Sequence, residues 1–254
     1  MKTDTFKTYR YFLKDSIRKT IAFQFTDQNQ GVPVPPIEKP YPDGSTLIDL
    51  PAPDEWQQIP KIDITQAIGN RKSRRAYRDQ NLSLEELAYL LWCTQGVRSN
   101  RFHGHAYRTV PSAGCRHALE TYLAIFKVDG IDPGVYRYLP LSHQLLFEFK
   151  DEMLSEKMIT ASLSQPYPGQ SAVTFIWSAI PYRMEWRYGL AAHKVIALDA
   201  GHVCQNLYLA CEAINAGTCA IAAYDQEEID ELLALDGEEE YVIYLAPVGK
   251  VKTR

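Results

Sequence analysis

The segment NRKSRRAYRD, residues 70–79, places five basic side chains in ten positions of a chain whose formal net charge is −4. Arg71, Ser73 and Arg75 alternate along it, so they share one side if the segment is extended. Two guanidinium forks and a hydroxyl suit the oxygens of a phosphate. A solvated basic face after a helix end is the alternative. We favour a small local anion site, with Lys72, Arg74 and Arg78 facing solvent or acidic neighbours.

The composition sets limits on the class of protein. A chain of 254 residues with 46% hydrophobic content can bury a full core. Its 27 basic and 31 acidic residues give no overall field for nucleic acid or an anionic membrane. We find no apolar run of about 18 residues for a spanning helix, and the polar start does not resemble a signal peptide. We therefore expect a cytoplasmic protein with no nucleic-acid or membrane partner.

Metal and disulfide chemistry are not expected. The five cysteines are widely spaced and form no C-x-x-C pair. His103 and His105 form an H-x-H pair, but no second ligand cluster lies close in sequence. Cys204 and Cys211 fall on the apolar face of a predicted helix, where a thiol packs as a small apolar group.

Capping residues and apolar spacing predict the helices. The first begins at Asp63, presents Ile64, Ala67 and Ile68 on one face, and ends at Gly69. Further helices are predicted over 83–96 with a Ser83–Glu86 capping box, over 199–217 with Asp199 as the N-cap, and from Asp225 onward.

Apolar runs predict the strands, at 120–128, 135–140, 144–149, 171–180, 218–224 and 241–251. Several links between them are too short for regular right-handed crossovers. The fold class is therefore α+β with one mixed sheet. Residues 27–60 are rich in proline and lack apolar periodicity, so they should form an extended arm over the surface.

Two further segments suggest ligand contacts. Pro111-Ser-Ala-Gly114 stands directly before a buried strand, and its small residues allow backbone to approach a flat ligand, although Gly114 also suits an ordinary turn. Ser112 lacks the G-x-S-x-G surroundings of a hydrolase nucleophile. Gly249 and Lys250 follow the last strand and are a weak signal taken alone.

Four motifs together resemble the nitroreductase superfamily. RKSRRAY (71–77) resembles its R-R-S-x-R-x-F/Y motif, and PSAGCRHALETYL (111–123) resembles the P-S-A-G motif of its SagB-type branch. Two later stretches, 198–221 and 232–249, are similar to further signatures of that branch. The resemblance runs in the right order over about 60–250, and four linked motifs are far more specific than one.

The resemblance implies an FMN oxidoreductase with a nitroreductase-like fold. A central mixed, mainly antiparallel sheet would be flanked by helices in an intertwined homodimer, whose two active sites lie at the subunit interface. Residues 1–60 would be an N-terminal extension or dimer arm, and residues 61–254 the FMN-binding domain.

The resemblance also assigns site residues by position. Arg71, Ser73 and Arg75 would hold the FMN phosphate, with Gly249 and Lys250 beside it. Ser112, Ala113 and Gly114 would line the flavin ring through their backbone. Ala222 and Ala223 match a backbone segment near the flavin that usually contains glycine, which makes this chain a departure from the pattern.

The reaction is less closely defined. SagB-type dehydrogenases, which oxidise peptide azolines to azoles, use a Lys-Tyr pair where this chain has Arg187 and Tyr188. Arginine stays protonated and cannot act as the base, so Tyr188 is the candidate acid or base. An ion pair of Arg187 with Glu185 and a packed Tyr188 ring is the structural alternative.

We therefore expect hydride transfer through flavin N5, using NAD(P)H and a small acceptor such as a nitro compound or quinone. Azoline dehydrogenation is the alternative reaction. A non-catalytic flavin-binding protein is the alternative of another class, and a nucleic-acid-binding protein comes last.

Overall fold

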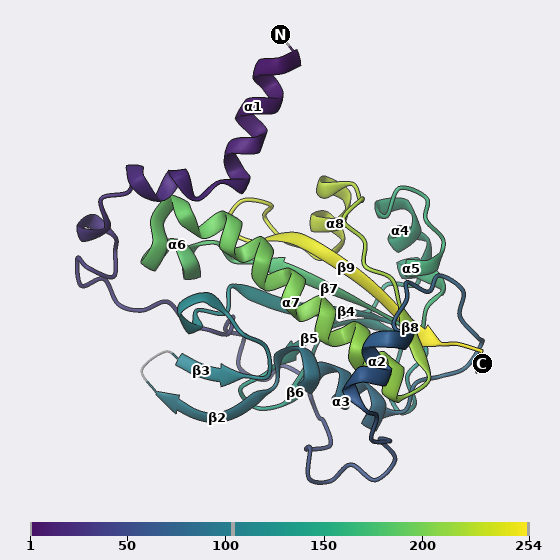
Figure 1. The fold of residues 1–254 in the computed structure, drawn as a ribbon. Helices are drawn as coiled ribbons and strands as arrows, with labels where there is room; N and C mark the ends of the chain where they lie inside the picture. Colours follow the sequence, from purple (N-terminus) through teal and green to yellow (C-terminus); the bar gives the residue numbers. More distant parts are fainter. Residues whose placement is uncertain (1, 103–104, 253–254) are drawn as a thin grey trace.

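A seven-stranded sheet forms the centre of the computed structural model, which describes residues 2–102 and 105–252 (Figure 1). In spatial order its strands are β1 (Leu47–Asp49), β6 (Gln144–Phe149), β5 (Gly134–Leu139), β4 (Leu119–Ile125), β7 (Val173–Ala179), β9 (Tyr241–Lys250) and β8 (Ala216–Thr218). Each neighbouring pair is antiparallel. A parallel contact occurs at the isolated bridge between Leu82 and Val128. The α+β class and the mainly antiparallel character are confirmed, whereas the expectation of a mixed sheet is wrong, because all six described strand pairs of this sheet are antiparallel.

The central strands explain why the sequence there is apolar on both faces. Every residue of β4 and β7 is buried. Successive side chains point to opposite faces, so Leu123 of β4 joins one core while its neighbours Tyr122 and Ala124 join the other. The sheet therefore separates two apolar layers, each of which needs a cover of helices.

Helices supply both covers (Figure 1). The long helix α7 (Ala192–Ala213) crosses one face, together with α3 (Leu84–Gln95) and α2 (Ile64–Asn70). The other core includes α4 (Leu154–Ala161) and α8 (Gln226–Leu232), and the short α5 (Tyr167–Gln170) contacts α4. A short helix, α6 (Tyr182–Tyr188), leads from β7 toward α7. Separate from the sheet, β2 (Val97–Phe102) and β3 (His105–Arg108) form a hairpin.

The predicted helix starts are confirmed at three places. Asp63 accepts from the Thr65 and Gln66 amides, Ser83 and Glu86 complete a capping box, and Asp225 accepts from the Glu228 amide. The apolar face predicted for α2 is only partly buried. Ala67 packs inside, whereas Ile64 and Ile68 are 59% and 58% exposed in the single chain.

Two predicted boundaries are wrong. Asp199 is not an N-cap, because α7 begins seven residues earlier at Ala192 and ends before Gly217, which lies in β8. The strand predicted over 218–224 is also displaced. Pairing with β9 covers Ala216–Thr218, and only the single bridge of Ile221 to Leu245 follows.

The N-terminal region has more structure than its sequence suggested. Helix α1 (Lys2–Leu13) projects away from the body (Figure 1) and is followed by two short 3-10 turns, Asp15–Thr20 and Phe23–Phe25. The arm at 27–60 lacks helices, and its regular element is the three-residue β1 at the sheet edge.

None of the helices within the described ranges has both the length and the apolar content needed to cross a membrane. Among the same residues no group of three or more His, Cys, Asp and Glu could hold a metal ion, and His103 lies outside them. Cys204 and Cys211 are buried free thiols, as the packing interpretation predicted. Burial raises the pKa of Cys204 to about 12, which keeps this thiol protonated at neutral pH.

Candidate functional site

The basic segment is extended and is held at intervals by the end of the sheet. The Arg74 amide donates to Thr218 O of β8 at 2.9 Å, and the Arg78 amide donates to Lys250 O of β9 at 2.8 Å. Between them the Tyr77 hydroxyl donates to Pro247 O at 3.0 Å. The Arg74 side chain points inward to Glu212, at 3.3 Å.

Arg71 and Ser73 meet at one side chain of α7. The Arg71 guanidinium lies 5.2 Å from the ring centroid of Tyr208, and Ser73 Oγ is 2.9 Å from the Tyr208 hydroxyl. That hydroxyl also accepts the Ala220 amide at 2.8 Å. Arg71 and Ser73 thus turn to Tyr208, while Arg74 turns into the body.

Arg75 continues the same group toward Ala223. Its guanidinium lies 5.9 Å from the ring centroid of Tyr167, whose hydroxyl donates to Gln165. Gln165 in turn donates to Ala223 O at 2.9 Å. Ala222 and Ala223 are both exposed. We call Arg71, Ser73, Arg75, Tyr167 and Tyr208 the basic group.

Lys250 and Gly249 have other partners. The Lys250 ammonium pairs with Glu86 in the first turn of α3 and donates to Ile214 O at 2.8 Å. A Cβ on Gly249 would lie 2.7 Å from the Tyr77 ring, so glycine there lets the basic segment pack against β9. Only the backbone of these two residues therefore adjoins the basic segment.

The loop of residues 112–117 brings a second set of predicted residues together. Gly114 has φ of +58°, and a Cβ added to it would lie 2.5 Å from the Tyr188 hydroxyl and 2.9 Å from Arg187. Two separately predicted features, the P-S-A-G turn and the Arg187–Tyr188 pair, are thus neighbours in space. Cys115 and His117 in the same loop also have positive φ, at 56° and 48°.

Arg187 and Tyr188 end α6 and are both half-buried. The Arg187 guanidinium lies 5.5 Å from the Tyr188 ring centroid. The alternative that Arg187 pairs with Glu185 is not what the structure shows, because Glu185 Oε1 lies 2.7 Å from His193 Nε2. Arg187 stays beside Tyr188 and Gly114.

Cys115 is not an activated nucleophile despite a neighbouring histidine. His117 Nε2 lies 2.8 Å from Ala106 O, so it carries its proton toward that carbonyl and cannot take one from the thiol. Burial lowers the pKa of His117 to about 3. The Cys115 thiol donates to the same Ala106 oxygen, at 3.1 Å.

Sequence reasoning missed the contact that α7 makes with this loop. The Asp199 carboxylate is buried and accepts the Ala113 amide at 3.2 Å. A signal was present, since an aspartate inside a long apolar repeat is a poor helix former with no capping role to play.

The basic group and the loop lie on opposite sides of α7. Asp199 touches the loop and Tyr208 touches the basic group, nine residues further along. That is two and a half turns at about 3.6 residues per turn, so the two side chains leave α7 in opposite directions, roughly 13 Å apart along its axis. The two sets therefore flank α7 on different sides.

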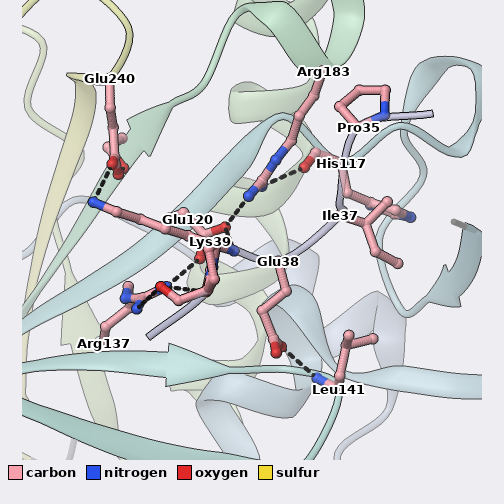
Figure 2. A network of polar contacts seen from close by, with 12 residues as sticks. Pro35, Ile37, Glu38, Lys39, His117, Glu120, Arg137, Leu141, Arg183 and Glu240 are labelled. Carbon is pink, nitrogen blue, oxygen red and sulfur yellow. Dashed lines mark hydrogen bonds and ion pairs between the residues drawn. The ribbon is translucent and has the colours of Figure 1, made fainter. Parts of the chain in front are cut away.

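A segment of the arm is tied to the body beside the loop (Figure 2). We call residues 32–40 the strap. Buried arginines donate to its carbonyls: Arg116 to Pro35 at 3.0 Å, Arg108 to Ile37 at 2.7 Å, and Arg137 to Lys39 at 2.7 Å. Trp186 of α6 donates to Val32 O at 2.9 Å. The strap therefore braces both the loop and the helix that carries Arg187 and Tyr188.

Comparison with known proteins gives a consistent result. The nitroreductase family model matches residues 68–250. MJ1384 of Methanocaldococcus jannaschii, which bears a nitroreductase name, is 31% identical over 207 residues, covering 82% of this chain and 98% of that protein.

Two solved structures share the fold. One, from Ralstonia eutropha JMP134, is described as a nitroreductase and has a TM-score of 0.66 at 24% identity, covering 87% of this chain and all of that one. The other is the E. coli microcin synthetase McbBCD complex with truncated pro-MccB17 bound. It has a TM-score of 0.60 at 18% identity, covering 85% of this chain and 79% of that one.

Proposed function

Since this chain belongs to the nitroreductase family, we propose that it is an FMN-dependent oxidoreductase acting with NAD(P)H on a small acceptor such as a nitro compound or quinone. The observation that carries the proposal is the contact of the 112–114 turn with Arg187 and Tyr188. In this contact the backbone of residues 112–114, which could lie against a flat ring, is next to the Tyr188 hydroxyl, the candidate proton donor.

The side chains fit FMN at both ends. In the basic group, two guanidiniums and a serine hydroxyl offer donors and positive charge to a phosphate. At the loop, the missing side chain of Gly114 lets Tyr188 and Arg187 lie against the turn, which places a hydroxyl and a positive charge where the flavin ring would be held. Ala222 and Ala223 are exposed beside Gln165 and can offer backbone contacts. Lys250 would have to leave Glu86 to reach a phosphate, so the assignment depends on Arg71, Ser73 and Arg75.

FMN, when bound, supplies hydride transfer at its N5. The chain's own contribution is to hold and orient it, and to supply charge and protons nearby. The Arg187 guanidinium provides positive charge beside Gly114. Tyr188 places a hydroxyl at the same turn and can donate or accept a proton there.

We propose a homodimer in which each active site is shared. The basic group and the loop face opposite sides of α7, and in the dimer the loop of one chain would lie against the basic group of the other. Apolar side chains that a partner could cover are exposed on the same helical layer, namely Ile64, Ile68 and Leu198.

Azoline dehydrogenation is the second candidate reaction. The shared fold with a chain of McbBCD, a complex solved with a peptide precursor bound, favours it. Arg187 in place of the expected lysine argues against it, because arginine cannot take a proton from an azoline ring.

Flavin binding tests the phosphate assignment. The purified protein should be yellow and should release FMN on denaturation. Arg75→Ala should lower FMN affinity at least tenfold, whereas the matched control Arg78→Ala, also an exposed arginine of the same segment, should retain it. Equal retention by both variants would contradict the assignment.

Turnover distinguishes the two reactions. Steady NAD(P)H oxidation with a quinone supports the reductase. Conversion of an azoline peptide to its azole, abolished by Tyr188→Phe, would instead establish the dehydrogenase. Bound FMN with neither activity would make the chain a non-catalytic flavoprotein.

A further inference from the structure

Asp199 lies in the interior of α7, where the helix itself has no use for a carboxylate. Its side chain is 6% exposed, and burial raises its pKa. Burying a carboxylate is unfavourable unless it is hydrogen-bonded. The Asp199 carboxylate should therefore have hydrogen-bond partners outside α7.

The carboxylate points at the start of the 112–117 loop. Oδ2 of Asp199 accepts the Ala113 amide at 3.2 Å, and interaction with the Ser112 side chain offsets part of the rise that burial causes in the pKa of Asp199. The Ser112 hydroxyl accepts the His117 amide at 3.0 Å. The start of the loop is thus tied to α7 at Ala113, and Ser112 beside it is tied to the far end of the loop at His117.

This loop needs external support to keep its shape. Cys115 and His117 adopt positive φ, which costs free energy for residues other than glycine and persists only when the surroundings enforce it. Arg183 supports the end of the loop by donating to His117 O at 3.2 Å (Figure 2). Asp199 provides the matching support at the start.

We propose that Asp199 is a positioning residue, which fixes the 112–117 loop through Ser112 and Ala113 so that Gly114 presents its backbone to the flavin ring beside Tyr188. The role in flavin binding rests on the proposed function, whereas the role in ordering the loop does not. Asp199 acts through the loop and is not itself a catalytic residue.

Amide hydrogen exchange of the FMN-free protein tests the ordering role. Asp199→Ala should speed exchange of the peptide covering residues 112–117 at least tenfold. Asp230→Ala is the matched control, because Asp230 is also a buried helical aspartate that accepts a backbone amide, that of Val242 at 2.7 Å. Unchanged exchange of the loop in Asp199→Ala, or equal acceleration there in Asp230→Ala, would overturn the proposal.

Ser112→Ala provides a second route if Asp199→Ala does not fold. It removes the hydroxyl that accepts the His117 amide and should speed exchange of the same peptide. Asn at position 199 keeps one acceptor oxygen, so Asp199→Asn should fall between Asp199→Ala and the unmodified protein. Full protection in Ser112→Ala would contradict the proposed set of bonds.

FMN titration then tests the link to the flavin. Asp199→Ala should raise the Kd for FMN about tenfold and alter the visible circular dichroism of the bound flavin, with partial rescue by Asp199→Asn and no change in Asp230→Ala. If the unmodified protein binds no FMN, the proposed function fails while the exchange result stands. If Asp199→Ala binds FMN with unchanged Kd and spectrum, the inference about the flavin fails.

Discussion

The carboxylate of Glu120 lies in the interior between two guanidiniums, 2.5 Å from Arg183 Nη2 and 3.6 Å from Arg137 Nη1 (Figure 2). All three side chains are 2% exposed. Glu120→Gln would leave Arg183 without its carboxylate partner, while Arg137 would keep Glu148 at 2.8 Å, and breaking a buried pair in this way costs about 3–5 kcal/mol. We expect a loss of that size in the free energy of unfolding, measured with urea.

A surface pair provides the control for that measurement. Asp79 is 2.5 Å from Lys127 Nζ, with an Asp79 side chain that is 90% exposed. Exposed pairs contribute roughly 0–1 kcal/mol, so Asp79→Asn should change little. If Asp79→Asn and Glu120→Gln lowered the free energy of unfolding by similar amounts, the buried network would stabilise the fold no more than a surface ion pair does.

His117 makes stability depend on pH. Burial lowers its pKa to about 3 in the folded chain, whereas an unfolded chain binds the proton near pH 6.5. As pH falls below the unfolded value, the unfolded state alone takes up this proton, so folding stability falls. The slope approaches about 1.4 kcal/mol per pH unit until the folded pKa is reached. His117→Gln should therefore reduce the slope of the unfolding free energy against pH, measured between about pH 6 and pH 4, by close to the value for one proton. An unaltered slope would contradict this role of His117.

At the scale of elements, the capping box of α3 is a test of local stabilisation. Ser83 accepts the Glu86 amide at 3.1 Å, and Glu86 accepts the Ser83 amide at 3.0 Å. Ser83→Ala should lower the free energy of unfolding by about 0.5–2 kcal/mol. Ser83→Asp, which preserves an N-cap acceptor, should retain most of it. Equal destabilisation by both would show that packing, not capping, holds the helix start.

Elements were predictable where one local signal dominates. The buried runs of β4 and β7, the capping box of α3 and the N-caps Asp63 and Asp225 could be predicted without knowing their tertiary partners. The three-residue β8 was misplaced because an edge strand this short is fixed by its pairing with β9. Helix α6 was missed because it is short and begins after Pro181 with no side-chain cap.

Candidate site residues could likewise be assigned from local motifs, but their tertiary partners could not. Arg71, Ser73 and Gly114 were assigned through motifs, and the structure places each among partners that sequence alone did not identify, such as Tyr208 and Tyr188. Asp199 was assigned to a cap because capping is the usual role of aspartate at a helix, whereas its actual partner is a loop 86 positions away in sequence. Such pairs are set by tertiary packing.

At the scale of the whole molecule, the proposed dimer predicts a mass of twice 28.9 kDa in sedimentation. Leu198 is 54% exposed on α7, and Leu198→Asp should weaken association and FMN binding together, because a charge buried in an apolar interface is unfavourable. Met153→Asp, at a residue also 54% exposed but beside α4 on the other face of the sheet, is the control. A dimer insensitive to Leu198→Asp would place the interface elsewhere.

Five carbonyl oxygens of the strap accept hydrogen bonds from the body, at Val32, Pro35, Ile37, Lys39 and Pro40. Two side chains add to them: Glu38 accepts the Leu141 amide, and Lys39 pairs with Glu240. Every amino acid supplies a carbonyl oxygen, and so does proline, which has no amide hydrogen to leave unpaired. Side chains of the strap other than those of Pro35, Ile37, Glu38 and Lys39 can thus change during evolution while its course over the body stays the same. Related chains can therefore be expected to keep the gripping arginines more faithfully than the segment they hold.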